Sequence, residues 1–148
     1  MEVVVVYLHY IGIIAIAVAL VSELLHLEAS ENLAWVRHLA WVDFAYLAAA
    51  ILVLVTGVLR LLWYGKGPSF YLHNPFFYIK LALFVAIGLI SIAPTRYMLR
   101  WRRDAIASIL PPPEEVAHVR RYVIAELAMF ILIPLFAVLA ARGIGSQG

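Results

Sequence analysis

Residues 3–25 read VVVVYLHYIGIIAIAVALVSELL, and this stretch decides the class of protein. A helix of about 20 mostly apolar residues is long enough to cross a hydrocarbon core of about 30 Å. Three further stretches of this kind lie at about residues 44–63, 77–96 and 122–141. Lipid offers backbone groups no partners, and none of the four stretches alternates as a membrane β-strand would. The sequence therefore predicts an all-α fold, with four transmembrane helices forming one domain over residues 1–148.

The composition supports a membrane protein and excludes several other classes. Hydrophobic residues make up 66% of the chain and charged residues 14%, with a mean hydropathy of +0.97. A soluble domain carries about 25% charged residues, and a disordered chain is far less hydrophobic. The absence of cysteine excludes disulfides, iron–sulfur clusters and thiolate zinc sites. A net charge of +2 indicates no nucleic-acid partner, so the expected surroundings are the lipid bilayer.

The distribution of basic residues predicts the orientation. The first and third loops share one side of a four-span chain and carry seven arginines, whereas the other side carries at most four basic residues. Because basic residues gather on the cytoplasmic side, both termini are expected on the extracytoplasmic side. The first span lacks the positive start of a signal peptide, so we interpret it as a retained helix. The seven arginines are Arg37, Arg96, Arg100, Arg102, Arg103, Arg120 and Arg121.

Three ionisable residues are expected toward the extracytoplasmic ends of the helices. His9 lies about 9 Å into the first span at 1.5 Å per residue, and Lys80 lies one to two turns into the third. Since one axial histidine suffices for haem, His9 is the candidate metal ligand of a b-type haem. Lys80 is the candidate opposite ligand or a partner for a propionate, and Arg60 a second propionate partner. The alternative is that His9 only forms a hydrogen bond between helices and that Lys80 extends toward water.

A second polar cluster is expected toward the cytoplasmic ends, formed by Glu23, Arg96 and Glu126. Glu23 and Glu126 could each pair with Arg96 or with the basic residues at 120–121, which would fasten the helix ends together. The alternative function for this cluster is a route for protons.

The segment 65–75, GKGPSFYLHNP, connects the second and third spans. Asn74 and Pro75 are typical of a helix start, with asparagine as the cap and proline in the first turn. We interpret the segment as a tight turn, and the alternative is a lid over a site containing His9 and Lys80.

Several stretches of the chain carry a family resemblance to an uncharacterised bacterial family of small predicted membrane proteins of unknown function. They are Tyr7 to Tyr10, Glu23 to Leu25, Gly57 to Arg60, the segment 65–75 with Lys80, and Leu99 to Arg103. This resemblance implies four helices and a place in the bacterial cytoplasmic (inner) membrane. More distantly, Leu8-His9 and Lys80 are similar to positions in the four-helix membrane protoporphyrinogen IX oxidases, and Leu8-His9 also in copper-resistance D-type membrane domains. In the oxidases these positions are associated with b-type haem and activity, but the Trp-Phe-Ala-Gly stretch of that family is replaced by residues 14–17, IAIA.

Three functions remain open at this point. The first is a haem b protein engaged in electron transfer or in porphyrin or quinone redox chemistry, with a redox partner. The second is a cofactor-free scaffold or lipid-binding bundle. The third is a small transporter, which would need to form a homo-oligomer. Small residues such as those at 48–50, AAA, permit close packing of helices within or between chains.

Overall fold

The computed structural model describes residues 1–28, 32–64, 69, 72–142 and 144. It contains four long helices, α1 (Glu2–His26), α2 (Leu33–Leu62), α4 (Pro75–Asp104) and α5 (Pro113–Ala141). A short 3₁₀ helix, η1 (Ala105–Ala107), follows α4. All four long helices have the length and apolar character needed to cross a membrane. The predicted all-α architecture of four membrane-spanning helices is confirmed.

The helix starts follow local signals in the sequence. The side chains of Asn32 and Asn74 each accept a hydrogen bond of 2.9 Å from the backbone N–H two residues on, which caps α2 and α4. Pro75 occupies the first turn of α4, as the Asn-Pro pair predicts. Pro113 begins α5, and Glu114 and Glu115 lie in its first turn, where the helix dipole favours negative charge.

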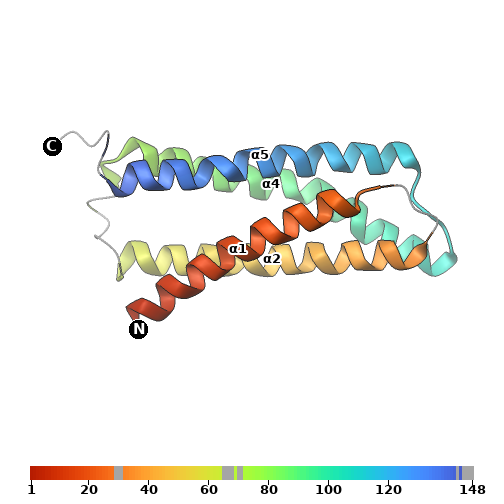
Figure 1. Ribbon diagram of the computed structural model, residues 1–148, viewed down its shortest axis with the longest axis horizontal. Helices are drawn as coiled ribbons and strands as arrows, with labels where there is room; N and C mark the ends of the chain where they lie inside the picture. The colour runs from red at the N-terminus through yellow and green to blue at the C-terminus, as the bar shows by residue number, and fades with distance from the viewer. Residues whose placement is uncertain (29–31, 65–68, 70–71, 143, 145–148) are drawn as a thin grey trace.

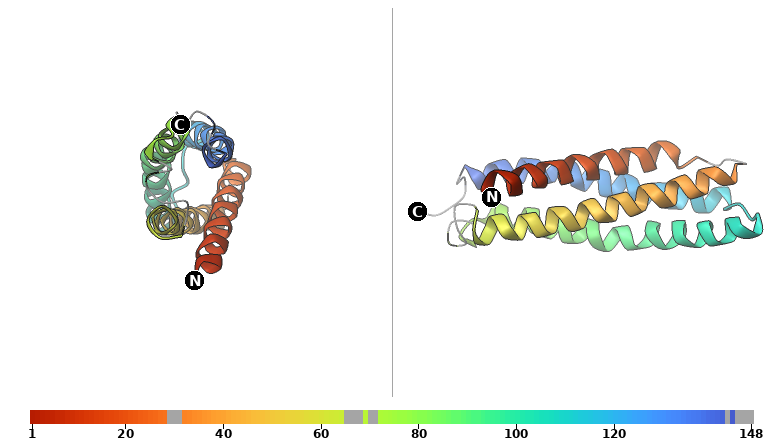
Figure 2. Two further views of the ribbon diagram at one scale, coloured as in Figure 1. Left: turned by 90° about the vertical axis from the view of Figure 1, so that its left-hand side faces the viewer. Right: turned by 90° about the horizontal axis from the view of Figure 1, so that it is seen from below.

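The helices run alternately up and down, so both termini lie at the same end of the bundle (Figure 1). We call this the termini end and the other the arginine-rich end. The most extensive packing is of α1 on α2 and of α4 on α5. The end-on view shows the N-terminal end of α1 standing away from α5 (Figure 2). The first half of α1 is therefore held mainly by α2. Which end faces the cytoplasm stays a prediction.

The packed interior consists mostly of aliphatic side chains, with a few large aromatic residues such as Trp101 and Tyr46. Leu20, Leu39, Met98 and Val119 are fully buried, and so is Trp101 near the end of α4. Many other large apolar side chains are exposed on all four helices, which suits a surface in contact with lipid.

Candidate functional site

Four polar residues from three helices form the first candidate site, which we call the His9 cluster: His9, Thr56, Arg60 and Lys80. His9 Nδ1 lies 2.8 Å from Thr56 Oγ1, which joins α1 to α2. Arg60 near the end of α2 and Lys80 near the start of α4 both interact electrostatically with the imidazole. The prediction that His9 and Lys80 lie at similar depth thus agrees with their positions.

Thr56 determines which nitrogen of His9 carries the proton. The Thr56 hydroxyl donates to the Leu52 carbonyl at 2.6 Å, the ordinary backward bond of a threonine inside a helix. A hydroxyl has only one hydrogen, so at 2.8 Å from His9 it acts as acceptor and Nδ1–H of His9 is the donor. The neutral imidazole then has its lone pair on Nε2. This is the tautomer that a second-shell hydrogen bond imposes on a metal-binding histidine.

Two further features surround the imidazole of His9. A Cβ added to Gly57 would lie 3.4 Å from His9 Cε1. The glycine therefore allows the imidazole to pack closely against α2. Arg60 Nε is buried without a hydrogen-bond partner, and the guanidinium carbon lies 5.8 Å from the centre of the Tyr10 ring. An imidazole lone pair with two nearby cations is a donor set that fits a haem and its propionates.

Gly12, which shares the helix face of His9, has a different role from Gly57. A Cβ on Gly12 would lie 2.7 Å from Val53 Cγ2, so α2 fills the space beside this glycine. The small residue therefore serves the close packing of α1 on α2.

A second group of polar residues lies deeper in the bundle, and we call it the carboxyl cluster: Glu23, Asp43, Tyr46, Thr95 and Glu126. The exposed fractions of the three acidic side chains are 2%, 6% and 1%. Tyr46 donates a hydrogen bond of 3.1 Å to Glu126 Oε2, and Thr95 donates one of 2.8 Å to Asp43 Oδ1. One carboxylate oxygen of Glu23 and one of Glu126 are buried without a partner.

The carboxyl cluster differs from the predicted group of Glu23, Arg96 and Glu126. Glu23 has Asp43 and Glu126 as its charged neighbours, and Arg96 lines a groove elsewhere on α4. The ion pair that the described residues form joins Arg100 to Glu115, at the arginine-rich end. Long arginine side chains near a helix end reach the headgroup level more readily than the interior, which accounts for this difference.

The other histidines are placed away from the His9 cluster. The rings of His26 and His38 lie 4.7 Å apart at the first loop. His73 Nδ1 lies 2.7 Å from the Ser69 carbonyl oxygen. Across the described part of the chain, no three His, Asp or Glu side chains are grouped so that they could hold a metal ion. Of the predicted turn at residues 65–75, residues 65–68, 70 and 71 fall outside the described part of the chain.

An apolar cavity of about 130 Å³ lies between the helices beside the carboxyl cluster. Tyr46 belongs to its lining, together with Phe84 and Gly88 of α4 and Phe130 of α5. Its walls are too apolar to order water, so the cavity extends the apolar interior around the Tyr46 ring.

These features define the class: an all-helical integral membrane protein with two polar clusters inside its bundle. Residues 1–145 match the model of a family described as Predicted membrane protein (DUF2214), and the chain belongs to this family. No curated protein and no solved structure matches the chain.

Sequence reasoning missed one residue of the His9 cluster, Thr56. It is a hydroxyl residue within the second apolar stretch, directly before Gly57. A polar side chain at that place could have drawn attention to it. The pairing with His9, 47 positions away, depends on how the two helices are rotated against each other.

Proposed function

We propose that this protein binds b-type haem in the bacterial cytoplasmic membrane and takes part in electron transfer or in porphyrin or quinone redox chemistry. The observation that carries the proposal is the hydrogen bond from His9 Nδ1 to Thr56, because it orients the ring and leaves the Nε2 lone pair for iron. When bound, haem supplies one-electron chemistry.

Each residue of the His9 cluster has a defined task in this proposal. His9 would be the axial ligand, and Thr56 would fix its tautomer. Arg60 and Lys80 would hold the carboxylates of the propionates, since cations near an apolar region bind carboxylates strongly. Lys80 would also be a candidate second ligand of the iron.

The test is the absorbance of the protein purified in detergent from haem-replete cells. We expect a Soret band and sharp b-type bands in the reduced-minus-oxidised spectrum. His9→Ala should remove them, whereas His26→Ala, on the same helix at the arginine-rich end, should leave them unchanged. Folding of each variant is checked by gel filtration. A colourless wild-type protein that stays colourless after addition of hemin would contradict the proposal.

A second candidate function is a cofactor-free scaffold, and one observation favours it. The bond between His9 and Thr56 already joins α1 to α2, so the histidine has a structural use without any ligand. In that case His9→Ala would destabilise a colourless protein, with about 1–3 kcal/mol lost when Thr56 loses its donor.

A further inference from the structure

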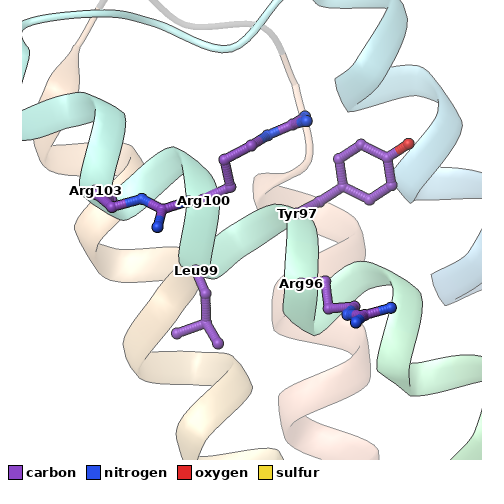
Figure 3. Close-up of a pocket in the computed structure, with 5 residues that line it drawn as sticks. All are labelled: Arg96, Tyr97, Leu99, Arg100 and Arg103. Atoms are coloured by element: carbon purple, nitrogen blue, oxygen red, sulfur yellow. The ribbon is translucent and has the colours of Figure 1, made fainter.

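The arginine-rich end carries a groove on the surface of α4, far from the His9 cluster. Its volume is about 440 Å³, and we call it the arginine groove; it is lined by Arg96, Tyr97, Leu99, Arg100 and Arg103. All five side chains come from one short stretch of α4, residues 96–103 (Figure 3). Three of them are guanidinium groups, spaced four and three residues apart, which places them on one side of the helix.

The length of α4 places this groove at the level of lipid headgroups. The helix has 30 residues from Pro75 to Asp104. At 1.5 Å per residue, about 20 of them cross a hydrocarbon core of about 30 Å. If α4 enters the core near its start, it leaves the core near Thr95, and the residues from Arg96 onward reach the opposite interface.

The three arginines are not equivalent. Arg100 forms an ion pair with Glu115 of α5, and its guanidinium carbon lies 4.9 Å from the centre of the Tyr97 ring. Trp101 Nε1 donates to the same Glu115 oxygen at 3.0 Å, so this corner is fixed by several contacts. Arg96 and Arg103 are exposed, and neither belongs to an ion pair within the described part of the chain. The groove therefore has one anchored guanidinium and two that are available to an anion.

An apolar side chain completes the arrangement. Leu99 lies between Arg96 and Arg103 in the sequence, lines the groove, and has an exposed fraction of 54%. A free inorganic anion gains nothing from a leucine, whereas a lipid brings an acyl chain together with its phosphate.

We propose that the arginine groove binds an anionic phospholipid, with the phosphate held by Arg96 and Arg103 and the upper acyl chain against Leu99. The site is independent of the proposed haem site, from which it is separated by the length of the bundle. Guanidinium groups suit phosphate because their fork of N–H donors can bind two oxygens at once.

The experiment compares two lipids of equal chain length, phosphatidylglycerol and phosphatidylcholine, added to the purified protein in neutral detergent. Melting is followed by tryptophan fluorescence at increasing lipid concentration. We expect phosphatidylglycerol to raise Tm at lower concentration than phosphatidylcholine. Each available arginine should contribute about fivefold to the preference, the effect of about one basic residue near an anionic surface.

Two double variants with equal charge change sharpen the test. Arg96→Gln with Arg103→Gln should abolish the preference, while Arg120→Gln with Arg121→Gln, exposed on α5 near the same end, should retain it. Arg103→Gln alone, a change at an exposed position, should lower the preference about fivefold and serves if the double variant fails to fold. An equal preference in the groove variants and wild type would overturn the proposal. So would protection by inorganic phosphate equal to that by phosphatidylglycerol, because it would mean that the lipid is not the ligand.

Discussion

The His9 cluster and the carboxyl cluster place polar groups in the same apolar bundle, but their partners differ. In the His9 cluster, hydrogen bonds to the Thr56 hydroxyl and to the Val53 backbone position the imidazole, and both neighbouring charges are positive. In the carboxyl cluster, hydrogen bonds from Tyr46 and Thr95 join α2 to α5 and α4 to α2. The basic groups are thus gathered in the His9 cluster and the acidic groups in the carboxyl cluster, and the two kinds are not paired across the bundle.

This contrast separates binding from structure. Buried polar groups in a membrane bundle either fasten helices together or mark a functional site. The hydroxyl donors of the carboxyl cluster connect helices deep in the bundle, where their loss would loosen the packing. The N-terminal end of α1, to which His9 belongs, stands away from α5 (Figure 2). The contact of His9 with Thr56 is only partly buried. Variants of the His9 cluster should therefore change ligand binding, and variants of the carboxyl cluster should change stability.

The largest effect is expected at His9. His9→Ala should abolish the haem absorbance, while Glu126→Gln, in the carboxyl cluster, should retain it in full. Both are measured as haem per protein after purification in detergent. Loss of haem in both variants would mean that the two clusters do not have separate roles.

The next effect concerns Thr56. Thr56→Val keeps the shape of the side chain but removes the acceptor of the His9 proton, so haem affinity should fall about 10- to 100-fold, as for other second-shell partners. Thr56→Ser keeps the hydroxyl and should bind haem close to the wild-type level. Hemin titration of the apoprotein measures both. Equal affinity in the valine and serine variants would show that the tautomer of His9 is not set by this bond.

A smaller effect, on stability alone, is expected at the contact between Tyr46 and Glu126. Glu126→Leu leaves the buried Tyr46 hydroxyl without its acceptor and should cost about 1–3 kcal/mol in unfolding free energy. Adding Tyr46→Phe removes the unpaired group and should recover part of that loss, so the double-mutant cycle should show coupling. Unfolding in mixed micelles measures the four proteins. Additive effects would mean that the hydrogen bond contributes nothing.

Sequence alone predicts most of the fold because each helix is marked by signals within its own stretch of sequence. The apolar length of each span, Asn74 with Pro75, and the acidic residues after Pro113 each act within one or two turns. It also predicts how far along their helices His9, Lys80 and Glu23 lie, because this follows from counting residues at 1.5 Å each. These parts of the structure need no knowledge of how one helix packs on another.

Rotation of the helices about their axes is what the sequence does not provide. The hydropathy of these helices is high all round, so no apolar stripe tells which face meets a neighbour. Thr56 was missed for this reason, and Glu126 was expected to pair with arginine although Tyr46 is its partner. Two residues at equal depth can face the same helix or opposite sides of the bundle, and only packing decides between them.

The last predicted effects, of which that at Gly88 is the smallest, come from two glycines that test this packing directly. Gly12→Ala should place a Cβ 2.7 Å from Val53 Cγ2, which forces α1 away from α2 and costs about 1–3 kcal/mol. Gly88→Ala on α4 meets nothing within 4 Å and should be neutral or stabilise the helix by up to about 1 kcal/mol. Both are measured as shifts in Tm. Because His9 lies on the same face of α1 as Gly12, the first variant should also weaken haem binding, whereas the second should not. Equal shifts for both glycines would mean that α1 does not pack on α2 as closely as this structure has it, and the bond from His9 to Thr56 would lose its geometric basis.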